Sequence, residues 1–384
     1  MLDTVWFTAA IWIGLAFLAS LISIRLGITV ALIEIFLGML AGNFFGFHET
    51  AEWIDFLAAL GSLTLTFLAG AEIDPETFKS NLKPSLTMGT LSFGIPFVFI
   101  WLFAQYVLGW GLYEAQIAGI ALSTTSVAII YAVVVEKGVS HTPLGKLLLT
   151  ACFITDLGTI LVLGVLFADF DLSMLLFIAA MAAALFAAPR ITKVLTAKYN
   201  AGKISQPEIK FLLLILFLLA GLATKAGSVA ILPSFIMGIA VAGIFVNDKT
   251  LMHRIRTISF TVFTPFFFIK AGLYISLRAI IASFGLITVL LLLKIVFKFA
   301  GVWPVSRFIK FNVKTSNYAA LLMSTGITFG TISALFGLNN QIINQNQYTI
   351  LVTVVLLSAL IPTIIAEKFF LPSLSEMGFI EPRR

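Results

Sequence analysis

Two apolar stretches of the chain carry a polar centre: YEAQIAGIALSTTSVAIIYAVVVE at residues 113–136 and TSNYAALLMSTGITFGTISALFGL at residues 315–338. One such stretch alone is typical of close helix packing through small residues. Two of them, about 200 residues apart, favour two membrane helices that are broken near the midplane. Unwound backbone is tolerated at that depth only where it is buried or lines a cavity. The polar residues of the second stretch are Ser324, Thr325, Gly326, Thr328 and Gly330.

The sequence around these stretches repeats at the same interval. Gly38 and Gly238 are 200 residues apart, and Gly70 and Gly272 are 202 residues apart. The matching segments are 36–38 with 236–238, 69–70 with 271–272, and 122–124 with 323–325. A shift of seven spans reverses the orientation of a segment in the membrane. The sequence therefore predicts an inverted repeat, which is typical of secondary transporters.

The composition excludes a set of soluble domains. The chain has 384 residues, of which 60% are hydrophobic and only 11% are charged, whereas soluble domains carry about 25% charged residues. A spanning helix needs about 20 mostly apolar residues. The segments that meet this requirement are 5–25, 28–47, 54–73, 82–108, 113–136, 143–168, 172–197, 207–226, 228–245, 255–277, 281–306, 315–338 and 347–371. We therefore predict an all-α polytopic membrane protein with about thirteen transmembrane helices.

The placement of the basic residues predicts the orientation of these spans. With the N-terminus outside, 19 of the 24 lysines and arginines fall in inside connections, and only Lys225 and Arg278 fall outside. This bias predicts an N-out, C-in topology. It also accounts for the net charge of +6 without a nucleic-acid partner.

Ionisable residues inside a membrane span are candidates for function, because each costs about 2.5–3.5 kcal/mol to insert at a helix centre. Asp156, in the middle of segment 143–168, is the strongest candidate. Burial favours the protonated form of a carboxyl, so a proton and a monovalent cation would compete for it. A structural ion pair with a lysine is the alternative. The hydroxyls predicted to replace water around the ion belong to Thr124, Thr125, Ser126 and Thr155.

The other intramembrane charges receive supporting roles. Lys294 is predicted to be the counter-ion of Asp156 when no cation is bound. Lys298, one turn further on the same helix face, is expected to extend toward the cytoplasmic side. Glu34 is expected to have a conformational or structural role, and Lys270 could be a gate or a structural partner. The three histidines share no metal-ligand spacing, so no cofactor or transition metal is predicted.

Several of these stretches together resemble a known family, the monovalent cation:proton antiporter-2 family, which includes NapA-like Na⁺/H⁺ antiporters and Kef-like K⁺ efflux systems. The resemblance covers about residues 5–371. The matching residues are Glu34 with Gly38 and Gly42, the stretch FLAGAEID at 67–74, Thr125-Ser126-Val127, the helix of Asp156, Phe267-Phe268 with Ala271-Gly272-Leu273, and Lys294.

The resemblance implies an NhaA-like fold and a homodimer in the lipid bilayer of a prokaryotic plasma membrane. Its two broken helices, 113–136 and 315–338, would cross. Sliding of the transport core against the dimerisation domain, an elevator-type mechanism, would carry Asp156 from one side to the other. The implied organisation is a dimerisation domain of 1–81 and 207–280, a transport core of 82–168 and 281–371, a linker helix in 169–206 and a cytoplasmic tail at 372–384.

Three departures from the family pattern refine the expectation. Relatives often carry a polar pair such as Asp-Asp, Asn-Asp or Gln-Asp, where this chain has Thr155-Asp156 and therefore one carboxylate. Residues 325–330 are uncharged, although many relatives have an Arg or Glu there. No nucleotide-binding regulatory domain is expected after the last span. A single carboxylate predicts one-for-one, electroneutral exchange, unless Lys294 also loses its proton when the cation binds.

The favoured function is therefore exchange of a monovalent cation for H⁺, with Na⁺ ahead of K⁺ and Li⁺. A Kef-like K⁺ efflux channel or transporter is the first alternative, and an organic-anion symporter on the same fold is the second. An enzyme is not expected, because the sequence has neither His-Glu-x-x-His nor Gly-x-Ser-x-Gly.

Overall fold

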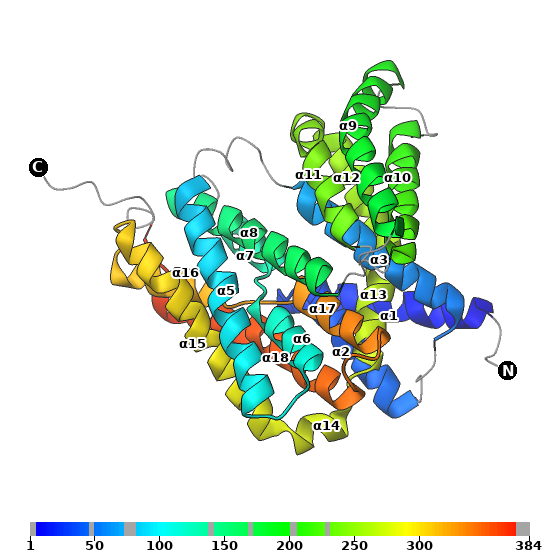
Figure 1. Ribbon diagram of the computed structural model, residues 1–384. Coiled ribbons are helices and arrows are strands. Elements are labelled where there is room, and N and C mark those ends of the chain that lie inside the picture. Colours follow the sequence, from blue (N-terminus) through cyan, green and yellow to red (C-terminus); the bar gives the residue numbers. More distant parts are fainter. Residues whose placement is uncertain are drawn as a thin grey trace, which may run out of the picture. The chain divides into compact units, whose positions relative to one another are not determined.

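The computed structural model of the protein is helical throughout the residues that it describes, which are 5–45, 50–72, 82–136, 142–167, 172–199, 206–226 and 231–373 (Figure 1). Ile73 and Asp74 of the family-like stretch, and the tail from residue 374, lie outside these ranges. The elements are α1 Val5–Leu26, α2 Val30–Phe45, α3 Glu52–Ala71, α5 Leu82–Tyr106, α6 Leu112–Ser123, α7 Val127–Glu136, α8 Pro143–Leu166, α9 Leu172–Tyr199, α10 Pro207–Lys225, α11 Ile231–Asn247, α12 Lys249–Ile258, the π-helix η1 Ser259–Phe263, α13 Thr264–Leu273, α14 Leu277–Ala282, α15 Phe284–Phe308, α16 Val313–Met323, α17 Thr328–Asn339, α18 Gln345–Ile365 and the π-helix η2 Ala366–Phe370.

Each of the thirteen predicted apolar segments contains a helix. Segment 113–136 is divided into α6 and α7, and segment 315–338 into α16 and α17, so the two predicted breaks are confirmed. Among the described residues, nine helices are long and apolar enough to cross a membrane, and two shorter apolar helices lie at Val30–Phe44 and Ile231–Val246. The chain is therefore a multi-pass membrane protein by length and composition, while the count of thirteen spans and their orientation stay predictions.

The sequence did not predict two further interruptions. Segment 255–277 changes from α12 through the π-helical turn η1 into α13. Segment 281–306 begins inside the short helix α14, and α15 starts after Ser283, where the backbone leaves helical geometry with φ −107° and ψ 15°. The signal for the predicted breaks was a run of consecutive polar residues. Ser259 and Thr261 of η1 are separated by an apolar residue, and Ser283 is a single polar residue between apolar neighbours.

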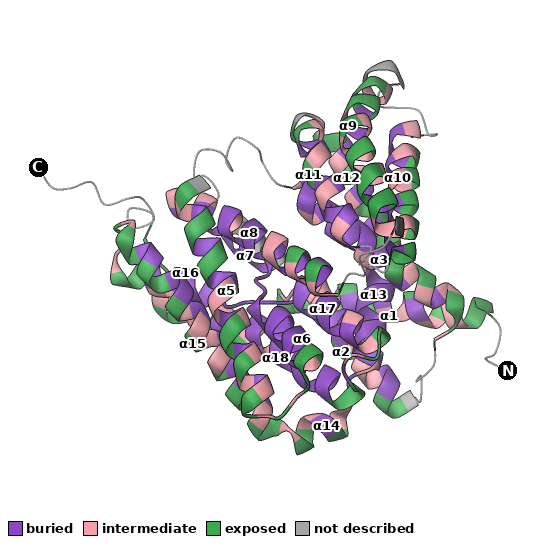
Figure 2. Ribbon diagram, in the orientation of Figure 1, coloured by how far each residue is buried: buried purple, intermediate pink, exposed green. Residues whose placement is uncertain are grey.

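Burial differs widely between helices (Figure 2). In the most apolar part of Val313–Asn339, 89% of the residues are buried inside the protein, whereas only 17% are buried in α1 and in Ser173–Thr196 of α9. The exposed residues of α1 and α9 are mostly large and apolar, such as Phe17 and Phe186. This is the pattern expected when lipid, not water, surrounds a helix.

The chain folds into two compact units. Unit 1 comprises Met1–Glu49, Lys79–Thr159 and Phe268–Arg384, and unit 2 comprises Thr50–Phe78 and Ile160–Phe267. The boundaries pass through α8 and α13, so these two helices each contribute to both units.

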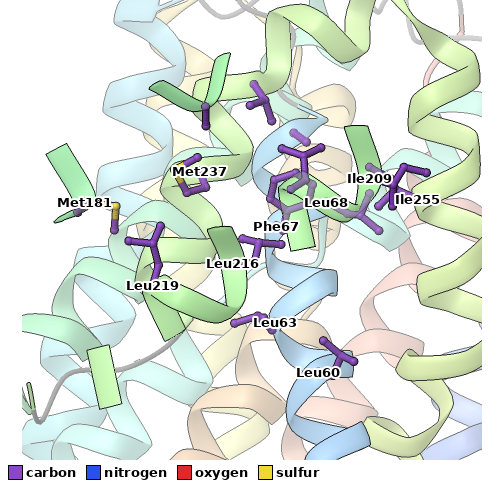
Figure 3. Packing of buried hydrophobic residues seen from close by; sticks show 14 of the residues in the cluster. Leu60, Leu63, Phe67, Leu68, Met181, Ile209, Leu216, Leu219, Met237 and Ile255 are labelled. Carbon is purple, nitrogen blue, oxygen red and sulfur yellow. The ribbon is translucent and has the colours of Figure 1, made fainter. Parts of the chain in front are cut away.

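The interior of unit 2 is a hydrocarbon core in which α3 packs against α11 (Figure 3). Glycines allow the two backbones to touch. A Cβ atom on Gly70 would lie 2.2 Å from the Phe235 carbonyl oxygen, and one on Gly238 would lie 2.1 Å from the Phe67 carbonyl oxygen. Any larger residue would force the helices apart.

Unit 1 contains a second crossing of the same kind, between α2 and α13. A Cβ atom on Gly38 would lie 2.1 Å from the Ile269 carbonyl oxygen, and one on Gly272 would lie 2.1 Å from the Ile35 carbonyl oxygen. These four positions correspond to those of the α3–α11 crossing at the offsets of 200 and 202 residues found in the sequence. The internal repeat is thus reproduced in the backbone contacts.

Candidate functional site

The two helix breaks of unit 1 lie against each other. At Thr124 the chain leaves α6 in an extended conformation, with φ −67° and ψ 157°. The Thr125 hydroxyl donates a hydrogen bond to the Met323 carbonyl oxygen at 2.9 Å, and the Ser126 N–H donates to the Thr325 carbonyl oxygen at 3.1 Å. The backbone groups freed at one break are therefore partly satisfied by the other, which makes unwound chain tolerable in a buried position.

The remaining hydroxyls at the breaks donate mainly to their own helices. Thr124 donates to the Ala121 carbonyl oxygen at 3.0 Å, and Thr325 donates to the Leu322 carbonyl oxygen at 2.7 Å. A hydroxyl that has donated its hydrogen keeps lone pairs with which it can accept. The breaks therefore present oxygen acceptors, the ligand type that a small hard cation prefers.

One face of α8 carries the predicted carboxyl. Cys152, Thr155, Asp156 and Thr159 follow at spacings of three and four residues, which places them on one side of a helix, and each is at most 1% exposed. The Thr155 hydroxyl donates to the Cys152 carbonyl oxygen at 2.7 Å, and the Thr159 hydroxyl donates to the Thr155 carbonyl oxygen at 2.8 Å. The Asp156 Oδ1 atom is buried and has no hydrogen-bond partner in the part of the chain that the structure describes.

Both lysines of α15 are fully buried, so the expectation that Lys298 extends to the membrane surface is wrong. Its ammonium group donates to the Thr125 hydroxyl at 2.8 Å and to the Ser92 hydroxyl of α5 at 3.1 Å. Lys298 also interacts electrostatically with Asp156. Satisfied donors at this depth explain why the side chain stays inside, because an unpaired buried charge is costly.

Lys294 lies at the crossing of the two breaks. A Cβ atom on Gly326 would lie 2.6 Å from the Lys294 Nζ atom and 3.1 Å from the Thr124 Oγ1 atom. The Nζ atom has no hydrogen-bond partner in the described part of the chain. The lysine whose charge acts on Asp156 is Lys298, so the pairing of Lys294 with Asp156 stays a prediction.

Ser92 is the site residue that the sequence analysis missed. It is fully buried on α5, which packs along α15. A single serine in an apolar span gives no signal of its own, because small polar residues are common in membrane helices. Only the packing of α5 against α15 shows that this serine accepts from Lys298.

The predicted break residues otherwise fall where expected. Ser126 sits at the start of α7, where its hydroxyl oxygen accepts from the Ile129 N–H at 3.4 Å. Ser324 donates to the Ala320 carbonyl oxygen at 2.7 Å. Thr328 is the first residue of α17 and is half-buried. A Cβ atom on Gly330 would lie 2.9 Å from the Ala121 carbonyl oxygen, so a glycine there lets α17 pack onto the end of α6.

Glu34 and Lys270 are both buried beside the glycine crossing of unit 1. Glu34 lies on α2, 2% exposed, one turn before Gly38, and its Oε2 atom has no hydrogen-bond partner within the described ranges. Lys270 lies on α13, one residue after Ile269 of that crossing, and is 6% exposed. Glu72 follows the last residue of α3 and pairs with Arg256 of α12.

Two broken helices that lie against each other, with buried lysines at the breaks and a buried carboxyl on α8, are typical of an ion-coupled secondary transporter. Residues 13–370 match the family described as sodium/hydrogen exchanger, transmembrane, and the chain belongs to this family. The predicted resemblance to cation:proton antiporters is thus confirmed, and the chain is a transporter, not an enzyme.

Individual relatives agree with the family. The chain is 28% identical over 336 residues to the probable Na⁺/H⁺ antiporter 3 of Methanocaldococcus jannaschii, covering 84% of this chain and 85% of the relative. It is 28% identical over 370 residues to a Na⁺/H⁺ antiporter of Enterococcus hirae, covering 92% and 94%. The solved structure of the sodium proton antiporter MjNhaP1 from M. jannaschii has the same fold, with a TM-score of 0.70 over 94% of this chain and 97% of that chain at 16% identity.

Proposed function

We propose that this chain exchanges one monovalent cation, Na⁺ in the first place, for one proton across the membrane, and that Asp156 binds either ion in turn. The observation that carries the proposal is the Asp156 Oδ1 atom, which is buried and has no hydrogen-bond partner among the described residues. Membership of the sodium/hydrogen exchanger family supports Na⁺ and H⁺ as the exchanged ions.

The geometry supports direct competition at one carboxyl. A charged carboxylate in a buried position is stabilised by a cation or neutralised by a proton. Hydroxyl oxygens of Thr124, Thr125 and Ser126 at the first break, and of Thr155 on α8, supply uncharged ligands that can replace the water shell of a small cation. Binding of the cation therefore requires release of the proton, which couples the two fluxes.

The stoichiometry follows from the number of carboxyls. If only Asp156 changes its proton, the site carries the same charge with either ion bound, and the exchange is electroneutral. Lys298 would balance the charge of Asp156 in the intermediate that holds neither ion, and its ammonium group donates to Thr125 at the first break. Loss of a proton from Lys298 or Lys294 during cation binding would instead make exchange electrogenic.

The alternating access would be of the elevator type in a homodimer. The polar residues of the site lie within residues 82–168 and 281–371, the segments assigned to the moving core. Residues 1–81 and 207–280 would form the dimerisation domain in the plasma membrane of a prokaryote. The exchange needs no cofactor beyond the two transported ions.

Purified protein in liposomes tests the proposal. An imposed pH gradient is followed with an internal pH dye while Na⁺, K⁺ or Li⁺ is added in turn. We expect proton movement driven by Na⁺, and a loss of about 100-fold or more in Asp156→Asn, which keeps the size of the side chain. Asp248→Asn is the matched control, because Asp248 only caps α12, where its side chain accepts from the Leu251 N–H.

Each outcome separates the alternatives. Proton movement driven only by K⁺ would identify K⁺ as the transported cation. A K⁺ current without proton movement would favour the Kef-like channel, and no response to any of the three ions would favour another solute. Wild-type exchange in Asp156→Asn would overturn the role of this carboxyl.

A further inference from the structure

The face of α8 that carries Asp156 also carries a thiol. Cys152 is the single cysteine of the 384 residues and lies one helical turn before Asp156, at the spacing where side chains are neighbours. It is completely buried. The Asp156 carboxyl is buried on the same helix face, so the sulfur and the carboxyl are neighbours in one buried environment.

A second observation points to a ligand at this helix face. The Asp156 Oδ1 atom is buried, with no hydrogen-bond partner among the residues that the structure describes, and a buried carboxylate oxygen in that condition is stabilised by a cation. Oxygen ligands suit hard cations, whereas a thiolate selects soft ones. The hydroxyls at the helix breaks are oxygen ligands and do not favour a soft cation, so the preference for a soft cation arises from Cys152 alone.

We propose that the Cys152 sulfur and the Asp156 carboxylate together form a binding site for a thiophilic monovalent cation, with Ag⁺ as the probe. This proposal rests on the proposed function in one respect, because the same carboxylate is proposed to bind the transported ion. On binding, the S–H bond breaks, an S–Ag bond forms and the proton passes to solvent, without any electron transfer. Silver held in this way blocks both the proton and the transported cation.

Binding is measured first, because it does not depend on transport. The full chain in detergent micelles is titrated with silver nitrate by calorimetry, in a buffer whose amine ligand keeps free silver low and with nitrate salts throughout, since chloride precipitates silver. We expect about one Ag⁺ per wild-type chain, no such binding in Cys152→Ser or Cys152→Ala, and at least about tenfold weaker binding in Asp156→Asn. Sodium nitrate should weaken silver binding in the wild type and not in Asp156→Asn.

Transport provides the second readout. In liposomes, Ag⁺ should stop cation-driven proton movement by the wild type, and excess dithiothreitol should restore it. The Cys152→Ser variant, scored against its own rate without silver, should resist the same Ag⁺ concentration. Because this variant contains no other thiol, any remaining inhibition comes from outside the proposed site.

Two results would overturn the silver site. One is equal silver affinity in Asp156→Asn and the wild type, which would mean that the thiol binds without the carboxyl. The other is no binding of Ag⁺ to the wild-type chain. A chain that moves no protons with any cation would instead sink the proposed function, while the calorimetric titration would still decide on the site.

Discussion

The two glycine crossings have the same close contact between helix backbones, but different side chains are buried beside them. In the α3–α11 crossing of unit 2, the repeat places Ser234 and Leu68 at the positions that Glu34 and Lys270 occupy in the α2–α13 crossing of unit 1. Around its crossing, unit 2 packs a cluster of hydrocarbon side chains. Unit 1 buries charges there and at the breaks.

This difference separates the residues that the helix contact requires from those that it does not. Contact between two backbones needs only glycines at the crossing point, and both copies have them. Buried charges cost free energy in a membrane, which makes those of unit 1 the candidates for a functional role. Asp156, Lys298 and its partners Ser92 and Thr125 all belong to unit 1.

Truncation of the apolar core should give the largest loss of stability and leave ion dependence unchanged. Phe67 is 1% exposed and packs edge-on against Phe245. We expect Phe67→Ala to lower the free energy of unfolding by about 3–5 kcal/mol, because the removed ring leaves a cavity. Thermal unfolding in detergent measures the loss. A changed cation KM in the surviving protein would show that unit 2 takes part in ion binding.

Alanine at equivalent glycines should test whether the two crossings are alike. Gly38→Ala and Gly238→Ala each place a methyl group 2.1 Å from a backbone carbonyl oxygen, and each should destabilise by about 1–3 kcal/mol through overpacking. Gly14→Ala is the control, since a Cβ atom there meets nothing within 4 Å. If only one of the two variants lost stability, the two crossings would not be equivalent.

The two lysines of α15 should have separable effects within unit 1. Removal of the positive charge nearest Asp156 strengthens the binding of any cation there, H⁺ included. We therefore expect Lys298→Ala to move half-maximal exchange to higher pH by about one unit, and Lys294→Ala to move it less. Exchange rates across a pH series measure both shifts. The reverse order would identify Lys294 as the partner, as the sequence alone predicts.

The sequence predicted the features that have a local signature. Polar clusters within apolar runs indicated both breaks, a carboxyl in the middle of a span indicated Asp156, and nearly equal offsets indicated the paired glycines. Lys294 and Lys298 lie one turn apart on one face of α15, so their sequence positions do not distinguish them. The choice between them depends on how α15 packs against α5, where Ser92 accepts from Lys298, and this is a property of tertiary structure.

Cation-induced proton release tests the central claim most directly. Detergent-solubilised protein in weak buffer with a pH dye receives the transported cation, and released protons are counted per chain. The account predicts about one proton from the wild type and from Asp248→Asn, and none from Asp156→Asn. Equal release from Asp156→Asn and the wild type would contradict it, because the exchanged proton would then come from a different group.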